Sequence, residues 1–359
     1  MIKKLVLTAF LACFALSANA QIATPRLDSG FHTYGGAAAG WRYNNNVSLD
    51  GISAKGITEQ DGEENGDVVS GLSAKGPDDA SSLPFLSGAY RGATWAGEIY
   101  TNLTNGRNTD IEMDLDQNSD FNTFNIYTEK QEQRLNLAYV IGEVLSVGIG
   151  YSNVNVRNKY ALAGTSMEYQ QLTDSTETGM SLTASYNIGN VVFIAGGLES
   201  VTQNGSYEEA SSQTGSTEAD FVENSWTNTL YGIGFITGDP TETQFRLEYS
   251  VISSPESEKE AESDKMASYH PETTHSFATI EAKFSEFLIS YQNETESEKK
   301  IDGFERETVT AMLGLGWQPM EGIAVSVYSW DRKITIKEDS LGDFEAMPKG
   351  YRFIVGYNF

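Results

Sequence analysis

The stretch "RLNLAYVIGEVLSVGIGY", residues 134–151, decides the fold of this chain. From Leu135 to Ile141 every second residue is large and apolar, and these residues alternate with Arg134, Asn136 and Ala138. After a short turn at residues 142–144, the same alternation runs from Leu145 to Tyr151. A period of two places one set of side chains on each face of a β-strand, so the stretch predicts a tight β-hairpin.

This unit of strand, tight turn, strand and polar connection recurs to the end of the chain. The alternation predicts twelve strands, at residues 93–103, 130–141, 145–157, 176–188, 191–203, 225–237, 243–254, 274–284, 287–298, 305–317, 323–336 and 350–359. Most are longer than the ~5–6 residues that are usual in soluble sheets.

The connections alternate in length, which is the second signal of architecture. One set has two to four residues, and the other is long and acidic: residues 158–175, 204–223, 255–273, 299–304 and 339–349. A soluble β-sandwich also alternates, but its loops show no such parity. We therefore predict an all-β, transmembrane, antiparallel up-and-down β-barrel of 12–14 strands, with short periplasmic turns and long acidic extracellular loops. Lipid cannot satisfy an open sheet edge, so the first and last strands should pair.

The N-terminus indicates secretion. Lys3 and Lys4 precede an apolar run from Leu5 to Leu16, and Ala18-Asn19-Ala20 resembles a small-residue cleavage site. Residues 1–20 are therefore predicted to be a signal peptide that is cleaved after Ala20. The only cysteine, Cys13, lies inside it, so the mature chain should have no disulfides.

Composition supports a folded, acidic, aromatic-rich chain. The net charge is −26; without Lys3 and Lys4, 22 basic residues face 50 acidic ones, which gives −28. This charge argues against nucleic-acid binding. The 18 tyrosines and 17 phenylalanines are too many for a disordered acidic chain.

The N-terminal part of the mature chain is less regular. Residues 21–80 form a Gly/Ala-rich segment that could plug the lumen or supply the first strands, and residues 81–359 should form the barrel. Within this segment, the sequence of residues 51–56 nearly recurs at residues 71–76. Two copies are too few to indicate a solenoid. The weak alternation from Pro84 to Gly92 could complete another strand pair and raise the count to fourteen.

The signal peptide, the strand rhythm and the final strand together resemble Gram-negative outer-membrane β-barrel proteins. The resemblance implies an outer-membrane location, contact with lipid and lipopolysaccharide, and recognition of the last strand by the barrel-assembly machinery. The residues that match this assembly signal are Tyr351, Tyr357 and Phe359.

A narrower resemblance is to the FadL-type channels for long-chain fatty acids and other hydrophobic compounds. It rests on the Gly/Ala-rich residues 35–40, the asparagines 44–46 and the stretch from Leu83 to Tyr90. The resemblance implies an N-terminal hatch inside the barrel. The Asn-Pro-Ala motif of that hatch is missing here, because the chain contains no Asn-Pro pair.

The residues opposite the apolar rows should face the lumen. A charged Arg or Lys on the lipid face would cost about 2–4 kcal/mol near the midplane, so the charged positions should point inward. The predicted lumen or pore residues are Glu98, Arg134, Asn136, Arg246, Glu248, Glu281, Lys283, Arg306 and Arg352. They could line a polar pore or contact cargo, or they could cross-link a filled lumen by ion pairs.

The sequence therefore favours a channel or transport barrel for small, possibly hydrophobic molecules, without a cofactor. The alternatives are a non-conducting structural or surface-interaction barrel, a porin, and an outer-membrane hydrolase. Catalysis would need His32, His270 or His275 beside a nucleophile such as Ser276, and sequence proximity alone does not make a triad. We expect neither an enzyme nor nucleic-acid binding.

A metal site is not expected either. The stretch from Asp114 to Asp120 begins like a calcium loop, but Ser119 stands where the loop needs glycine. Asn125 stands where it needs a bidentate acid.

Overall fold

The structure is a computed structural model of the whole chain. It describes residues 46–54, 61–64, 67–69, 73–75, 85–91, 94–102, 105–113, 122–141, 144–163, 168–189, 191–211, 215–238, 243–299, 304–320, 323–338, 342–346 and 349–358. Every regular element in these ranges is a β-strand, and they contain no helix that is long and apolar enough to cross a membrane.

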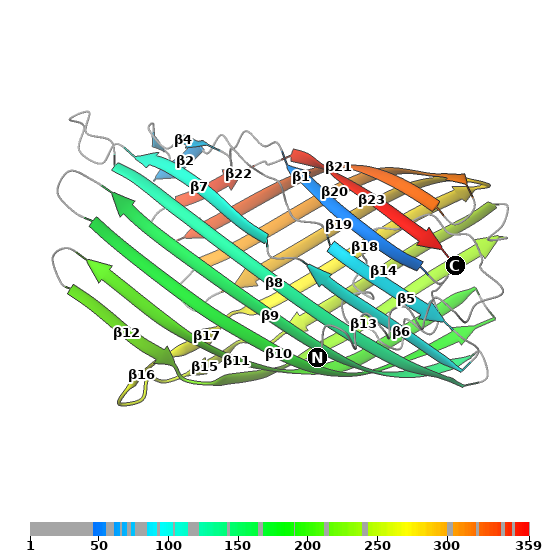
Figure 1. Cartoon of the computed structure of the whole chain (residues 1–359), viewed down its shortest axis with the longest axis horizontal. Helices are drawn as coiled ribbons and strands as arrows, with labels where there is room; N and C mark the ends of the chain where they lie inside the picture. Colours follow the sequence, from blue (N-terminus) through cyan, green and yellow to red (C-terminus); the bar gives the residue numbers. More distant parts are fainter. Residues whose placement is uncertain are drawn as a thin grey trace.

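Within the described part of the chain, fourteen antiparallel strands form one wall (Figure 1). In chain order they are β1 (Asn46–Ala54), β5 (Phe85–Arg91), β6 (Trp95–Asn102), β8 (Asn122–Ile141), β9 (Leu145–Ala163), β10 (Glu168–Ile188), β11 (Val192–Ser211), β13 (Asn224–Gly238), β14 (Thr243–Ser254), β18 (Glu272–Phe284), β19 (Phe287–Lys299), β20 (Phe304–Met320), β21 (Ile323–Glu338) and β23 (Lys349–Asn358). Each strand pairs with the strand before it and the strand after it in this series.

The wall closes because β1 lies between β5 and β23. Nine positions of β1 pair with β23, from Asn46 opposite Asn358 to Ala54 opposite Gly350. Five positions of β1 also pair with β5. The pairings therefore form a ring, as expected from the requirement that no strand edge be left open.

The two ends of the wall differ. At one end, which we call the tight-turn rim, strands are joined by short connections such as residues 142–144 and Ser285–Glu286. The other end, the hairpin rim, carries the remaining strands (left in Figure 1). These are β2 (Asp61–Glu64), β3 (Asp67–Val69), β4 (Ser73–Lys75), β7 (Asn105–Met113), β12 (Gly215–Phe221), β15 (Ser257–Lys259), β16 (Lys265–Met266), β17 (Ser268–His270) and β22 (Gly342–Ala346).

All twelve predicted strands are in the wall, but most of the predicted long loops are strands instead. Residues 158–163 and 168–175 continue β9 and β10 as one ladder, and residues 204–211 continue β11. These segments are rich in polar and small residues and carry few large apolar side chains such as Tyr160 and Leu162, so the regular apolar alternation ends while backbone pairing continues. Alternation reports the environment of a strand, whereas pairing requires only a neighbouring backbone.

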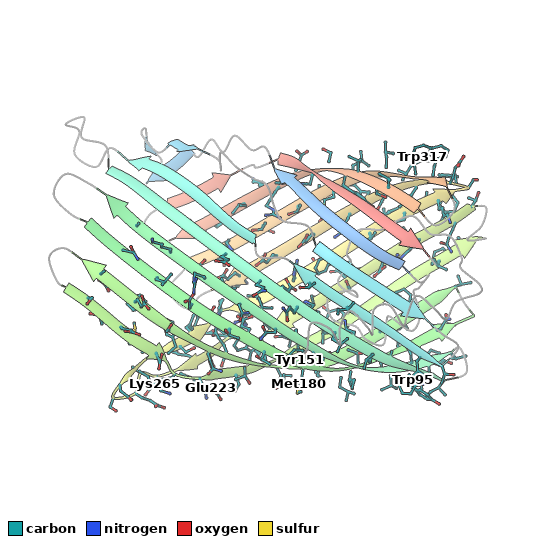
Figure 2. The ribbon with its side chains drawn as sticks, in the orientation of Figure 1. Trp95, Tyr151, Met180, Glu223, Lys265 and Trp317 are labelled. Carbon is teal, nitrogen blue, oxygen red and sulfur yellow. The ribbon has the colours of Figure 1, made fainter. Side chains whose placement is uncertain are left out.

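The outer face of the wall is an apolar belt with an aromatic row at each edge. Tyr151, Tyr231, Tyr249 and Tyr291 form the row toward the hairpin rim. The other row lies toward the tight-turn rim and consists of Trp95, Tyr139, Tyr186, Phe235, Phe245, Phe284, Phe287 and Trp317. Figure 2 shows Tyr151 and Met180 on the outside of the wall, and Trp95 and Trp317 near the tight-turn rim. Two aromatic girdles around an apolar band are typical of barrels that sit in a membrane.

We expect Leu182→Arg to destabilise the folded protein. Leu182 is 61% exposed on the outer face, in the middle of the apolar stretch of β10. An arginine there should lower the free energy of unfolding in lipid by about 2–4 kcal/mol. The measurement is a urea titration in liposomes.

The matched control is Glu218→Arg, an exposed position on β12 outside the wall. Equal stability losses for the two variants would contradict the lipid-facing assignment of the belt.

Candidate functional site

The inner face of the wall carries buried polar and charged side chains. Among the residues predicted to face the lumen, Asn136, Arg246, Glu248, Glu281 and Lys283 are buried, while the residues on either side of Asn136, Arg246 and Glu248 are exposed. Arg134 and Arg306 lie on the same face and are half-buried. The strands β6 and β23 carry Glu98 and Arg352, whose side chains lie outside the described part of the structure. Whether any of these residues contacts cargo stays a prediction.

Near the tight-turn rim, the inward charges form ion pairs with one another. Arg246 on β14 donates to Glu281 Oε2 on β18 at 3.1 Å, and it also pairs with Glu248 on its own strand. Lys283 is buried two residues along β18 from Glu281. Two basic and two acidic side chains therefore balance within this ion-pair cluster, as buried charges require.

Farther toward the hairpin rim, a hydrogen-bonded row crosses the wall around one carboxylate. Ser152 Oγ on β9 donates to Glu199 Oε1 on β11 at 2.9 Å. Asn228 Nδ2 on β13 donates to Glu199 Oε2 at 3.0 Å, and Ser254 Oγ on β14 donates to Asn228 Oδ1 at 2.6 Å. Both carboxylate oxygens of Glu199 are thus held by uncharged donors, and the side chain has one orientation.

A glycine allows this row to cross β10. Ser152 and Glu199 belong to strands on either side of β10, and Gly179 lies between them. A Cβ at Gly179 would overlap both Ser152 Oγ and Glu199 Oε1. The absence of a side chain at this point is therefore what brings the hydroxyl and the carboxylate into contact.

The row borders a cavity of about 190 Å³ inside the wall. One part of its lining is apolar and comes from Val154, Val201, Trp226 and Ile252. The other part is polar and includes Arg134, Glu177, Glu199, His275 and Glu296. A concave space with apolar walls and a few fixed polar groups is the usual form of a small-molecule site.

The hairpin of β15 and β17 lies toward the hairpin rim and supplies His270 to the lining of this cavity. Asn224 Nδ2 donates to the Ser257 carbonyl at 3.0 Å, and Ser257 Oγ donates to Asn224 Oδ1 at 2.7 Å. The His270 ring stacks on the Trp226 indole, with centroids 3.7 Å apart and planes 10° from parallel. We call this segment, residues 257–270, the capping hairpin.

The docked position of His270 changes its acid–base behaviour. Burial lowers the pKa of His270 from 6.5 to about 4. Among the described residues, its Nε2 has no hydrogen-bond partner, nor does the Nε1 of Trp226, so each ring of the stack has one polar atom without a partner there. The stack therefore favours the neutral imidazole.

The two histidines that the structure describes, His270 and His275, are each in contact with other side chains. His275 Nε2 lies 2.7 Å from Glu294 Oε1, and its ring contacts Phe277. His270 is engaged by Trp226 as described, and His32 lies outside the described residues. In the part of the chain that the structure describes, no group of three His, Cys, Asp or Glu side chains could hold a metal ion. The calcium-like stretch 114–120 falls outside that part.

The predicted assembly signal is only partly described. Tyr351 and Tyr357 lie in β23, opposite Ser53 and Val47 of β1, whereas Phe359 falls outside the described residues. Its role as an assembly signal, like the predicted contacts with lipopolysaccharide and the assembly machinery, stays a prediction.

A closed antiparallel wall that is apolar outside and polar inside defines the class of outer-membrane-type β-barrels. Solved structures with this fold include the Ralstonia pickettii toluene transporter TbuX, at TM-score 0.56 and 10% identity over 96% of this chain and 100% of that one. A Pseudomonas aeruginosa FadL homologue has TM-score 0.51 and 10% identity over 95% and 96% of the two chains. The monoaromatic hydrocarbon channel CymD has TM-score 0.51 and 12% identity over 94% of each.

These similarities confirm the predicted resemblance to FadL-type barrels at the level of the fold. The similar structures are named as channels and transporters, not as enzymes. No protein-family model and no curated protein match the sequence.

We expect Gly179→Ala to disrupt the row at Glu199. The added methyl group should displace Ser152 or Glu199 and break their hydrogen bond, at a cost of about 1–3 kcal/mol for the carboxylate left with one partner. Urea unfolding of Gly179→Ala, Ser152→Ala and the double variant measures the coupling. If the overlap with Ser152 is the cause, the double variant should be less destabilised than the sum of the two single variants. Simple additivity would contradict it.

We also expect docking of the capping hairpin to weaken in acid. The pKa of His270 is lower in the docked hairpin than in the free one. At any pH where the free imidazole is protonated, docking must therefore remove that proton, and this makes docking less favourable. Docking should therefore be strongest above about pH 6.5 and weaken as the pH falls from 6.5 toward 4. Amide hydrogen exchange of residues 257–270 between pH 7.5 and 4.5, corrected for intrinsic rates, is the measurement. The His270→Phe variant keeps a stacking ring without a titratable nitrogen and should lose this pH dependence.

Proposed function

We propose that this protein is an outer-membrane channel that takes up small molecules with an apolar body. The tight-turn rim faces the periplasm, and the hairpin rim with its capping hairpin faces the exterior. The observation that carries the proposal is the cavity inside a closed wall, with an apolar side at Val201 and Ile252 and fixed polar groups opposite.

The similar structures support this choice of cargo. TbuX is named as a toluene transporter and CymD as a monoaromatic hydrocarbon channel. A cavity of about 190 Å³ has room for a compound of that size, because a cavity of about 150 Å³ lined by apolar side chains can hold benzene. A monocyclic compound is therefore the proposed cargo.

The ion-pair cluster at Arg246 favours a second candidate, a barrel that does not conduct. Its charges satisfy one another across β14 and β18, which is how small barrels fill and brace their lumen. Conductance in planar bilayers separates the two functions, since a braced and filled barrel passes no current.

We expect Val201→Trp to reduce transport. Val201 is buried on the inner face and lines the cavity, so a larger side chain should occupy the space of the cargo. Uptake of toluene or benzyl alcohol into liposomes that contain the purified protein should fall several-fold. The control is Ser200→Trp, the next residue on the outer face of the same strand, which should leave uptake unchanged. Equal uptake by the unmodified protein and by empty liposomes would contradict the channel function itself.

A further inference from the structure

We propose that the cavity at Glu199 binds small organic cations, in which an ammonium group is attached to a single ring or a short alkyl chain. This inference rests on the proposed transport function and specifies its cargo. It goes beyond the hydrocarbons named for the similar structures, because it assigns a charged head group to the ligand.

The first observation is that Glu199 is a buried carboxylate that has no cationic partner among the residues the structure describes. Its side chain lines the cavity, and the residue is 5% exposed. Its two hydrogen bonds come from Ser152 and Asn228, both uncharged. Hydrogen bonds offset only part of the cost of burying a charge, so a cation placed beside Glu199 would be bound strongly.

The second observation is that the basic side chains around the cavity are already paired with acids. Arg134 pairs with Glu132, and Arg306 pairs with Glu296 and Glu298. His275 is hydrogen-bonded to Glu294. An incoming carboxylate would therefore have to displace an existing acid from its partner, whereas an ammonium group beside Glu199 would not have to break any of these pairs.

The net charge of the lining residues and their ion-pair partners also favours a cation over an anion. The acidic residues are Glu132, Glu177, Glu199, Glu294, Glu296 and Glu298, and the basic ones are Arg134 and Arg306. Without the two histidines in the count, six acidic and two basic side chains leave an excess of four negative charges among these described residues. The acidic balance of the whole chain, −26, would add to the attraction of cations toward the barrel.

The third observation is the shape and surface of the space. The walls supplied by Val154, Val201 and Ile252 are apolar, so they can hold a hydrocarbon body while its head group reaches Glu199. A volume of about 190 Å³ exceeds the ~150 Å³ that holds benzene by roughly the size of one methylammonium substituent. The ion-pair cluster at Arg246 does not compete as a site for cations, because its charges are balanced.

The test compares three ligands that share one ring and differ in charge. Benzylamine, benzyl alcohol and benzoate are titrated by calorimetry into the folded, detergent-solubilised full-length barrel at pH 7.5. We expect benzylamine to bind at least tenfold more tightly than benzyl alcohol, and benzoate to bind more weakly than either. Added salt should reduce the advantage of benzylamine. Equal affinities for benzylamine and benzoate would overturn the proposal, and this comparison needs no variant.

Variants then assign the effect to Glu199. Glu199→Gln keeps the size and one hydrogen-bond acceptor of the side chain, and it should abolish the tenfold preference while binding of benzyl alcohol is retained. The control is Glu223→Gln, an exposed acid near the hairpin rim and outside the cavity (Figure 2), which should keep the preference. A full preference in Glu199→Gln would overturn the role of this carboxylate.

Uptake into liposomes separates failure of this inference from failure of the proposed function. If benzyl alcohol is taken up but the three ligands are not distinguished, the barrel is a channel and the cation site is wrong. If none of the three enters above the level of empty liposomes, the transport function is wrong as well.

Discussion

The pairing of β1 with β23 is the contact on which the rest of this structure depends. A strand edge that faces hydrocarbon leaves N–H and C=O groups unsatisfied, at several kcal/mol each. The nine paired positions between Asn46–Ala54 and Gly350–Asn358 remove that edge, although the two strands come from opposite ends of the chain. Contacts of such sequence separation are slow to form, because the chain between them must be ordered first. The wall is therefore stable only as a complete ring.

Closure also separates two environments, and each places its own demand on the side chains. Outside, large apolar residues need no partners beyond lipid. Inside, every polar atom needs a hydrogen bond, and the nearest partner often stands two strands away. Glycines leave room for side chains to meet across an intervening strand. The missing side chain of Gly179 allows Glu199 to contact Ser152 across β10, and that of Gly234 allows the Phe193 ring to pack against β13. The glycine positions are therefore as important for the packing of the interior as the side chains that make the contacts.

The fold followed from the sequence because lipid imposes a period of two on every strand that crosses it. The sequence predicts the strands less well where a segment has no lipid-facing row of apolar side chains. Residues 46–54 carry only three large apolar side chains, Val47, Leu49 and Ile52, and Ile52 breaks the alternation, so the sequence leaves open whether they belong to the wall or to a plug. Residues 158–175 are rich in polar and small side chains and are predicted as a loop, whereas residues 158–163 and 168–175 extend the ladder of β9 and β10.

The site was predictable only in part, for a related reason. Parity along a strand predicts that Arg134, Arg246 and Glu281 point inward, and it would have placed Glu199 inward too, next to the outward Leu198. The alternation along a strand does not indicate which inward-facing residues contact one another. Glu199 lies 47 residues from Ser152 and 29 from Asn228, and those contacts depend on the register of four strands. The stack of His270 on Trp226 depends on a hairpin that folds back, which no pattern within a strand can indicate.

The ion-pair cluster at Arg246 and the hydrogen-bonded row at Glu199 show how one wall can contain both a stabilising cluster and a binding site. At Arg246 each charge has an opposite charge beside it, so nothing is gained by admitting another ion, and the cluster links β14 to β18. At Glu199 an arginine in the place of Asn228 would complete a similar pair. It would also fill the cavity that Trp226 and Ile252 border. Uncharged donors hold the carboxylate in position and leave its charge without a counter-ion in the described part of the chain. The same arrangement that costs stability in the empty barrel is therefore the one that leaves an attraction for a ligand to use.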